Sequence, residues 1–267
     1  MWFRSVSLKL GAVISALLWS MCLLPGFVAA EGELELIYFG HNDDAALLGI
    51  GHGLDESAER AGAWSFNLRV VGTDHFRPFR SPKPIAILAA ADAESLRILA
   101  QLNPEVAVFN LIEDFDDLRA ICMPNLFHML PSARMRADAL ALSSLVDDGE
   151  ALAWHDSLED PQAAAFVERF RKARKTYVSE QTYSGWLAAQ FLADALAVGA
   201  EDGSELLEYL RSGASTDDFK GVRNGFRETG QLSQAILIVQ DDKVIEQLPR
   251  RGSAPASLDD FGSVQCP

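Results

Sequence analysis

The chain has 267 residues, with 23 basic and 38 acidic side chains and a formal net charge of −15 at pH 7. This acidic balance argues against nucleic acid as a partner, because recognition of a polyanion needs a basic footprint. It also disfavours anionic lipid and long-range capture of an anionic ligand. The length allows one large domain or two small ones.

Residues 1–30 have the order of a secretory signal peptide. Arg4 and Lys9 precede an apolar run at residues 10–24, and Val28-Ala29-Ala30 forms a small-residue end. We expect cleavage after Ala30. The rival interpretation is a single membrane anchor, but the run is shorter than the ~20 apolar residues that a spanning helix needs. Cleavage removes two basic residues and no acidic residue, so the exported chain carries a charge of −17.

Strand and helix patterns alternate through the first half of the exported chain. Residues 65–71 alternate apolar and polar side chains, which predicts a half-buried strand. Residues 84–90 are almost wholly apolar, as in a parallel strand that is buried on both faces. The predicted strands are 34–39, 65–71, 84–90, 106–110 and 125–130, and the predicted helices are 45–61, a segment capped by Asp92, and 133–145. This order predicts an α/β fold with a parallel, doubly wound sheet in a Rossmann-like lobe at residues 31–145.

The second half, residues 146–249, has a different pattern. Two predicted strands flank Asp241-Asp242 and indicate a hairpin. The predicted helices are 161–175, 179–199 and 204–211, and the strands are 235–239 and 244–248. We therefore expect a reduced second lobe of helices and a β-hairpin. The C-terminal tail, residues 250–267, has no strong fold pattern.

Two cysteines, Cys122 and Cys266, remain after removal of residues 1–30. In an oxidising compartment a pair is more often bridged than free. The sequence cannot test the distance between them, so the bridged and the free states both stay open. A zinc site is less favoured, because neither cysteine has a second ligand at the usual spacing.

Three stretches resemble the type I periplasmic solute-binding proteins of ABC importers, in the leucine/isoleucine/valine-binding class. The first, Ala46-Leu47-Leu48-Gly49-Ile50-Gly51, is similar to the opening helix of that class. The second is Tyr183-Ser184-Gly185-Trp186, like a long helix near the second lobe. The third, Asp218-Phe219-Lys220-Gly221 followed by Phe226-Arg227-Glu228-Thr229-Gly230, is similar to its closing segment.

A closer resemblance is to a subgroup associated with quinone-dependent (PQQ) alcohol dehydrogenases. It rests on Asp117-Leu118-Arg119, Cys122, Asn125-Leu126-Phe127-His128 and Pro131-Ser132-Ala133-Arg134-Met135. The resemblance implies a periplasmic location, a small solute as ligand, an ABC permease of the inner membrane as partner, and a link to a quinoprotein dehydrogenase. One departure stands out, because only residues 146–152 occupy the place of a full βαβαβ core in the second lobe. Closure of two equal lobes on a ligand is therefore in doubt.

Ligands of an open parallel sheet bind beyond the carboxyl ends of its strands. The loops expected there are residues 40–44, 91–95, 110–114 and 130–133. His41, Asn42 and Asp43 are candidate ligand contacts, although Asn42 or Asp43 is equally well explained as a helix cap. Asn110 opens the third loop and is a further candidate.

Four other candidates carry an ordinary structural explanation as well. Ser132 offers a hydroxyl at a helix start, and Asp92 offers a carboxylate, but each is also typical of an N-cap. Tyr183 and Trp186 are candidates for an aromatic wall of the site, with core packing as the alternative. His128 lies on an apolar strand, which favours a core histidine. Because Asp92 and Glu94 would repel a carboxylate, we expect a neutral or cationic ligand.

The sequence lacks two common catalytic motifs. It has no Gly-x-Ser-x-Gly elbow and no HExxH pattern, so we expect a binding protein and not an enzyme. No cofactor and no metal site are predicted. Two alternatives to transport stay open: a non-transport accessory or sensor protein of a periplasmic quinoprotein dehydrogenase system, and an inactive remnant.

Overall fold

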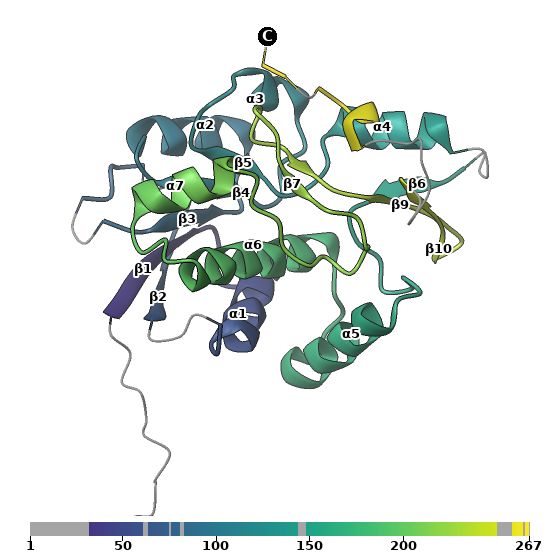
Figure 1. Cartoon of the computed structure of the whole chain (residues 1–267), viewed down its shortest axis with the longest axis horizontal. Helices are drawn as coiled ribbons and strands as arrows, with labels where there is room; N and C mark the ends of the chain where they lie inside the picture. Colours follow the sequence, from purple (N-terminus) through teal and green to yellow (C-terminus); the bar gives the residue numbers. More distant parts are fainter. Residues whose placement is uncertain are drawn as a thin grey trace, which may run out of the picture.

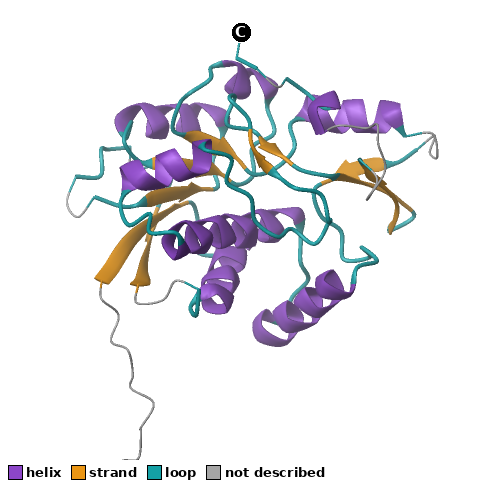
Figure 2. Ribbon diagram, in the orientation of Figure 1, coloured by secondary structure: helices purple, strands orange, loops and turns teal. Residues whose placement is uncertain are grey.

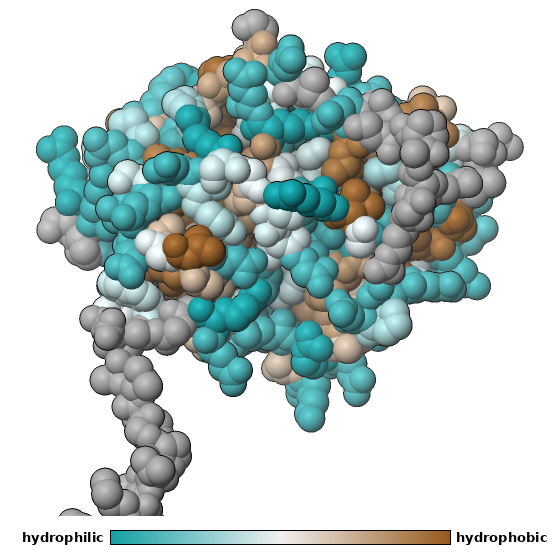
Figure 3. Space-filling model, viewed as in Figure 1, coloured by the Kyte–Doolittle hydropathy of each residue, from teal (hydrophilic) through white to brown (hydrophobic). Residues whose placement is uncertain are grey.

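The computed structural model describes residues 32–60, 64–74, 76–80, 83–143, 148–249, 258–263 and 265–266 (Figure 1). The predicted signal peptide lies outside these residues, as does most of the predicted tail. Among the described helices, none has the length and the apolar content to cross a bilayer. Hydrophilic residues predominate on the face seen in Figure 3, in keeping with the acidic composition.

Each strand and helix predicted from sequence is present. The strands are β1 (Gly32–Phe39), β2 (Trp64–Val71), β3 (Ala86–Ala89), β4 (Ala107–Asn110), β5 (Leu126–His128), β6 (Glu150–Leu152), β7 (Gly225–Phe226), β8 (Leu232–Ser233), β9 (Ile236–Gln240) and β10 (Lys243–Leu248). The helices are α1 (Ala45–Ser57), α2 (Ala93–Leu102), α3 (Asp116–Ala120), α4 (Ala133–Leu142), α5 (Pro161–Arg174), α6 (Glu180–Ala197), α7 (Gly203–Arg211) and the 3-10 turn η1 (Leu258–Asp260). The sequence analysis missed α3, β6, β7, β8 and η1, because two to five residues span too little of a helical or strand period.

The first five strands form one parallel sheet in the order β2-β1-β3-β4-β5. Tyr38 of β1 lies opposite Val70 of β2 on one side and Leu88 of β3 on the other. The predicted α/β class with a parallel sheet is therefore confirmed. Figure 2 shows the sheet at the centre of the larger part of the molecule.

Both faces of this sheet are covered by helices. Leu36 and Tyr38 of β1 belong to a buried cluster that includes Ile50 of α1 and residues of α6 and α7. Ile37 of β1 points to the other face, into a cluster with Leu96 of α2. Figure 1 shows α2 on one side of the sheet and α1 with α6 on the other. Since successive side chains of a strand point to opposite faces, the apolar run of each central strand is explained by burial on both.

Helices α1 and α6 cross at very close range. A Cβ atom built on Gly49 of α1 would lie 1.9 Å from the carbonyl oxygen of Thr182. A Cβ atom on Gly185 of α6 would lie 2.1 Å from the carbonyl oxygen of Ala46. The glycines therefore allow backbone-to-backbone contact between the helix of the first half and the helix of the second half.

A second, smaller module lies beside the large sheet. Its antiparallel sheet has the order β10-β9-β6, and α4 packs on it through Met135 and Ala139 (Figure 2). The predicted hairpin is present as β9 and β10. Its turn residues, Asp241 and Asp242, have φ of 51° and 62°, the left-handed values that a two-residue hairpin turn requires.

The packing of α6 and α7 joins the two halves of the sequence. Leu187 of α6 and Leu206 of α7 belong to the same buried cluster as Leu36 of β1. The sequence analysis placed both helices in the second lobe, but they cover the first sheet. The boundary at residue 145 therefore does not separate the hydrophobic cores, and the division into lobes stays a prediction.

The end of the chain is fixed to the middle of the chain. The sulfur atoms of Cys122 and Cys266 are bonded at 2.06 Å, with their Cα atoms 5.8 Å apart. Phe261 is fully buried in the cluster around α4, and Arg227 Nη1 donates to its carbonyl oxygen at 2.6 Å. The described part of the tail therefore lies over α3 and α4.

Candidate functional site

The loop after β1 holds three predicted ligand residues. His41, Asn42 and Asp43 are exposed there. The helix cap is Asp44 and not Asn42 or Asp43; its Oδ2 accepts hydrogen bonds from Tyr38 Oη and from the backbone N–H of His41, both at 2.6 Å. The exposed side chains remain available to a ligand, and their binding role stays a prediction.

Asp92 and Ser132 both cap helices. Asp92 Oδ1 accepts from the backbone N–H of Ser95 at 2.8 Å, at the start of α2. Ser132 Oγ accepts from the backbone N–H of Met135 at 3.2 Å, at the start of α4. Capping leaves the Ser132 hydroxyl proton free to donate, whereas Asp92 has no described role beyond the cap.

Asn110 and His128 form a buried pair at the carboxyl ends of β4 and β5. Asn110 Nδ2 lies 2.9 Å from His128 Nδ1, and its Oδ1 accepts from the backbone N–H of Glu113 at 2.8 Å. Burial and the nearby charge of Arg119 hold the pKa of His128 well below its usual range. The pair therefore shapes the loop after β4, and His128 is a core histidine as the sequence favoured.

Tyr183 and Trp186 lie in an aromatic cluster below the sheet. Tyr183 is fully buried and stacks on Trp154 with ring centroids 4.7 Å apart. Trp186 is 3% exposed, and its Nε1 donates to Glu56 Oε2 at 2.9 Å. Trp186 lines an open cavity of about 440 Å³ together with residues of α1, α5 and α6. The structure therefore does not bring the eight predicted ligand residues into one site.

A cavity of about 340 Å³ lies at the carboxyl end of the large sheet, and we call it the strand-tip cavity. Its walls are α3, the start of α4, the turn before β8 and the tail held by the disulfide. Of the predicted residues, Ser132 lines it. The lining residues are Asp116, Asp117, Arg119, Ala120, Ser132, Arg134, Met135, Thr229, Gln231, Ser263 and Gln265.

Arg119 is the central charge of the strand-tip cavity. It is 4% exposed, and burial lowers its pKa to about 10 against the opposing pull of nearby carboxylates. Its Nε donates to Gln231 Oε1 at 2.9 Å, and its terminal nitrogens donate to the carbonyl oxygens of Phe115, Glu113 and Leu130. Among the described residues no carboxylate lies within ion-pair distance of it. The Arg119 charge therefore has no carboxylate in direct contact there, while most of its N–H groups donate to protein oxygens.

Other groups of the strand-tip cavity add donors and acceptors. Thr229 is 2% exposed, and its Oγ1 accepts a long hydrogen bond of 3.4 Å from the backbone N–H of Gln231. Asp116 Oδ2 accepts from the backbone N–H of Arg134 at 2.9 Å. The cavity thus combines hydroxyl and guanidinium donors with two carboxylates, a set that suits a small polar ligand with mixed charge.

Sequence reasoning missed Arg119, Thr229 and Gln231 as candidate site residues. Arg119 follows the acidic run of residues 113–117, which is typical of a solvated face. Its burial depends on α3, a five-residue helix with no periodic pattern of its own. Gln231 follows Gly230, whose φ of 76° turns the chain back toward β5, and this glycine was the one local sign of a close approach.

Metal binding has no support in the described part of the chain. No group of three or more His, Cys, Asp or Glu side chains there is arranged to hold a metal ion.

Three solved structures of similar fold are substrate-binding or solute-binding proteins of ABC transporters. An ABC transporter substrate-binding protein from Desulfitobacterium hafniense superimposes with a TM-score of 0.65 at 12% identity, over 81% of this chain and 100% of that chain. A branched-chain amino acid binding protein from Streptococcus pneumoniae, in complex with isoleucine, gives 0.62 at 11% identity, over 81% and 99%. A solute-binding protein from R. palustris, in complex with benzoate, gives 0.60 at 13% identity, over 81% and 96%.

No protein-family model matches the sequence, and no curated protein matches it either. At these identities the likeness to solved structures defines the fold alone. The chain has the type I periplasmic-binding-protein fold, with a five-stranded parallel sheet, covering helices and a small antiparallel sheet.

Proposed function

We propose that this protein is the periplasmic solute-binding component of an ABC-type importer and captures a small solute reversibly in the strand-tip cavity. The observation that carries the proposal is the buried guanidinium of Arg119, which has no carboxylate in ion-pair contact among the described residues, in a cavity at the carboxyl ends of the strands. Ligands of open parallel sheets bind at this edge. The signal-peptide pattern of residues 1–30 supports export, and the fold supports an inner-membrane permease as partner.

The proposed ligand carries an anionic group, most simply a carboxylate. Arg119 would hold that group, with the hydroxyls of Ser132 and Thr229 as further donors. This differs from the neutral or cationic ligand expected from Asp92 and Glu94, because Asp92 caps α2 and Glu94 pairs with a neighbouring arginine. Isoleucine and benzoate, the ligands named for two structural neighbours, both carry a carboxylate.

The finer role that we propose is uptake linked to PQQ-dependent alcohol oxidation. Its support is the sequence resemblance around Asp117-Leu118-Arg119, Cys122 and Pro131-Ser132. Three of these positions, Asp117, Arg119 and Ser132, line the strand-tip cavity. A solute that is oxidised in the periplasm to a carboxylate fits both the resemblance and the buried arginine.

A second candidate function is a non-transport accessory or sensor role beside a periplasmic quinoprotein dehydrogenase. One observation favours it. Arg136 of α4 donates to Glu180 Oε1 of α6 at 3.0 Å and to the carbonyl oxygen of Ala151 at 2.6 Å. The bond to Glu180 ties the small module to α6, which covers the large sheet, and opposes the hinge closure that importers use to enclose a solute.

The test is a thermal-shift screen of the exported chain, followed by calorimetric titration. The probes are isoleucine, benzoate, benzyl alcohol, benzaldehyde, and divalent and trivalent cations. We expect carboxylates to raise the unfolding temperature and the matching alcohol to leave it unchanged, because only a carboxylate can form an ion pair with Arg119. Absence of a shift with every probe would count against solute capture and in favour of the accessory role.

Two substitutions test whether the carboxylate binds in the strand-tip cavity. Arg134→Gln removes a guanidinium from the cavity edge and should weaken carboxylate binding about ten-fold. Arg97→Gln is the matched control, because it removes an exposed arginine of α2 that pairs with a glutamate of its own helix. Equal losses in both variants would mean that general electrostatics, and not the strand-tip cavity, hold the ligand. Permease and ATPase genes beside this gene would favour transport over the accessory role.

A further inference from the structure

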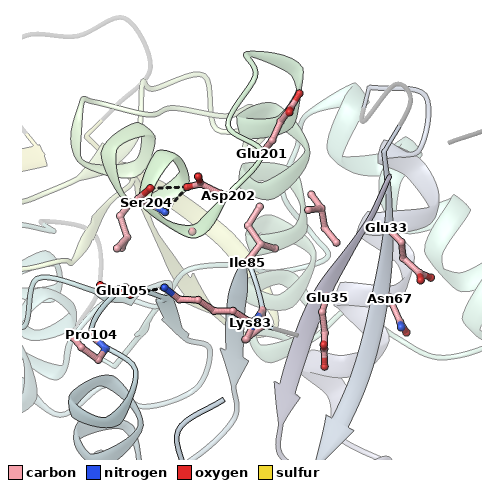
Figure 4. Close-up of a pocket in the computed structure, with 14 residues that line it drawn as sticks. Glu33, Glu35, Asn67, Lys83, Ile85, Pro104, Glu105, Glu201, Asp202 and Ser204 are labelled. Carbon is pink, nitrogen blue, oxygen red and sulfur yellow. Dashed lines mark hydrogen bonds and ion pairs between the residues drawn. The ribbon is translucent and has the colours of Figure 1, made fainter. Parts of the chain in front are cut away.

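Strand β2 forms an open edge of the large sheet. It lies outermost in the order β2-β1-β3-β4-β5, and no described segment pairs with its outer side. It is eight residues long and pairs with β1 without interruption along its whole length. Figure 4 shows Asn67 on β2 next to Glu35 of β1. An edge strand of this length leaves a row of backbone groups to which another strand can bind.

The outward backbone groups of β2 belong to every second residue. Gly40 donates from its backbone N–H to the carbonyl oxygen of Val71 at 3.0 Å, so Val71 directs its backbone groups toward β1. The N–H and C=O of one strand residue point to the same side, and this side alternates along the strand. The residues whose N–H and C=O point away from the sheet are therefore Trp64, Phe66, Leu68 and Val70.

These four residues are also apolar. Their side chains are partly exposed and pack on the buried cluster that includes α1 and α6. The other face of β2 has three exposed polar residues, of which only Arg69 is charged, and Arg69 pairs with Glu35 of β1. The strand has no proline, lysine or carboxylate, and its register with β1 has no bulge. It therefore lacks the features by which edge strands commonly avoid pairing.

The other described edges of the two larger sheets are short, covered or bulged. His128 of β5 donates from its backbone N–H to the carbonyl oxygen of Gly230 at 2.8 Å, so a loop covers that edge. Strand β6 has three residues, and Arg136 donates to the carbonyl oxygen of Ala151. Strand β10 begins with the exposed Lys243 and has a register shift against β9. Among these described edges, β2 alone is both long and open.

We propose that β2 binds β2 of a second copy of this chain in antiparallel register, so that the two large sheets join across a two-fold axis at Asn67. This register places Phe66 opposite Leu68, and Trp64 opposite Val70, on both sides of the axis. Every outward N–H and C=O of the four residues then has a partner in the other copy. Apolar side chains face apolar side chains, which stabilises an antiparallel pair.

The sequence of β2 matches itself best in this one register. An axis between two residues would set outward backbone groups against groups that already bond to β1. An axis one residue to either side would leave the first or the last outward residue opposite a position beyond the strand. With the axis at Asn67, Arg69 lies opposite Ser65, so no like charges meet. A second copy therefore fits the edge better than an unrelated peptide, because one strand supplies both halves of the match.

Pairing through β2 stops at two copies. It uses the open edge of both chains, and the far edge at β5 is covered, so the large sheet has no further open edge among the described strands. The strand-tip cavity lies beside α3 and α4, away from β2, and pairing leaves it uncovered. The proposed dimer is therefore independent of the proposed solute capture.

The test is the mass of the exported chain as a function of its concentration, measured by analytical ultracentrifugation. We expect a reversible equilibrium between monomer and dimer. Added salt should shift it toward the dimer, because salt screens the repulsion between two acidic chains. A mass that stays monomeric up to about 100 μM, or a dimer that salt dissociates, would overturn the proposal.

Substitutions at Asn67 test the position of the axis. Asn67→Lys places two lysines opposite each other at the axis, and Asn67→Glu places two glutamates there. Each variant alone should dimerise about five-fold more weakly than the wild-type protein, or worse. An equimolar mixture places lysine opposite glutamate and should recover the dimer. Because Asn67 is exposed, both variants should fold, which thermal unfolding reports.

Gln162→Lys and Gln162→Glu are the matched controls, because Gln162 is exposed on α5, outside the large sheet. Each should leave the dimer dissociation constant within a factor of about two. Equal weakening by the substitutions at Gln162 and at Asn67 would attribute the effect to net charge and overturn the proposed interface. A mixture of Asn67→Lys and Asn67→Glu that stays monomeric would do the same.

Discussion

Lys220 is the most completely buried cation of the described chain, and it lies where the two modules meet. Its Nζ donates to Gln234 Oε1 at 2.8 Å and to the carbonyl oxygen of Ala235 at 3.0 Å. Asp218 Oδ2 lies 3.9 Å away and has no hydrogen-bond partner among the described residues. Burial lowers the pKa of Lys220 to about 8, although Asp218 and Glu180 act to raise it.

This lowered pKa predicts a pH-dependent stability. Between about pH 8 and pH 10.5 the folded protein releases the Lys220 proton while the unfolded chain keeps it, so the free energy of unfolding rises with pH. Relative to Lys220→Met, the wild-type protein should gain on the order of 3 kcal/mol across this window. Urea unfolding at the two pH values measures the difference.

Lys243→Met serves as the control for Lys220, because Lys243 is exposed on β10. Its stability difference from the wild-type protein should not change over the same pH range. If the stability difference between Lys220→Met and the wild-type protein were equally independent of pH, the ammonium group of Lys220 would not be desolvated.

At the scale of elements, the crossing of α1 and α6 holds the two halves of the chain together. Gly49→Ala would place a methyl group 1.9 Å from the carbonyl oxygen of Thr182, so the helices must separate. We expect a loss of about 2 to 3 kcal/mol in the free energy of unfolding, measured by urea denaturation.

Gly51→Ala is the matched substitution on the same helix. Its methyl group meets only the end of the Arg174 side chain, at 3.3 Å, and that side chain can move. Because alanine is the better helix former by about 1 kcal/mol, Gly51→Ala should be neutral or stabilising. A similar loss in both variants would contradict the close-contact explanation and indicate a general effect of changing α1.

At the scale of the whole molecule, the disulfide closes a loop with a sequence separation of 144 residues and fixes one wall of the strand-tip cavity. The double variant Cys122→Ser with Cys266→Ser should lower the free energy of unfolding by about 2 to 4 kcal/mol. It should also weaken carboxylate binding, since Ser263 and Gln265 are then no longer held at the cavity. Urea unfolding and calorimetric titration measure the two effects.

The wild-type protein treated with a reducing agent is the comparison for this double variant, and the two should agree. Unchanged carboxylate affinity in the variant would mean that the tail takes no part in the strand-tip site.

The sequence alone determined the sheet, its helices and the edge at which a ligand site was expected. Periods of two and of 3.6 residues, with capping residues such as Asp92 and Ser132, are local properties, so the chain displays them before it folds. The short elements α3, β6, β7 and β8 were not predicted from the sequence, because pairing and packing form them and they have no periodic pattern of their own.

Only the tertiary structure decided which residues share a site. Arg119 is polar and follows an acidic run, yet the fold buries it against Gln231, which lies 112 residues further along the chain. Tyr183 and Trp186 bear aromatic rings suited to a ligand, yet Tyr183 is stacked on Trp154, and Trp186 contacts Glu56 of α1 and Phe166 of α5. Burial and charge compensation depend on contacts between distant segments, and no local pattern records those contacts. For the same reason α6 and α7, from the second half of the chain, complete the core of the first.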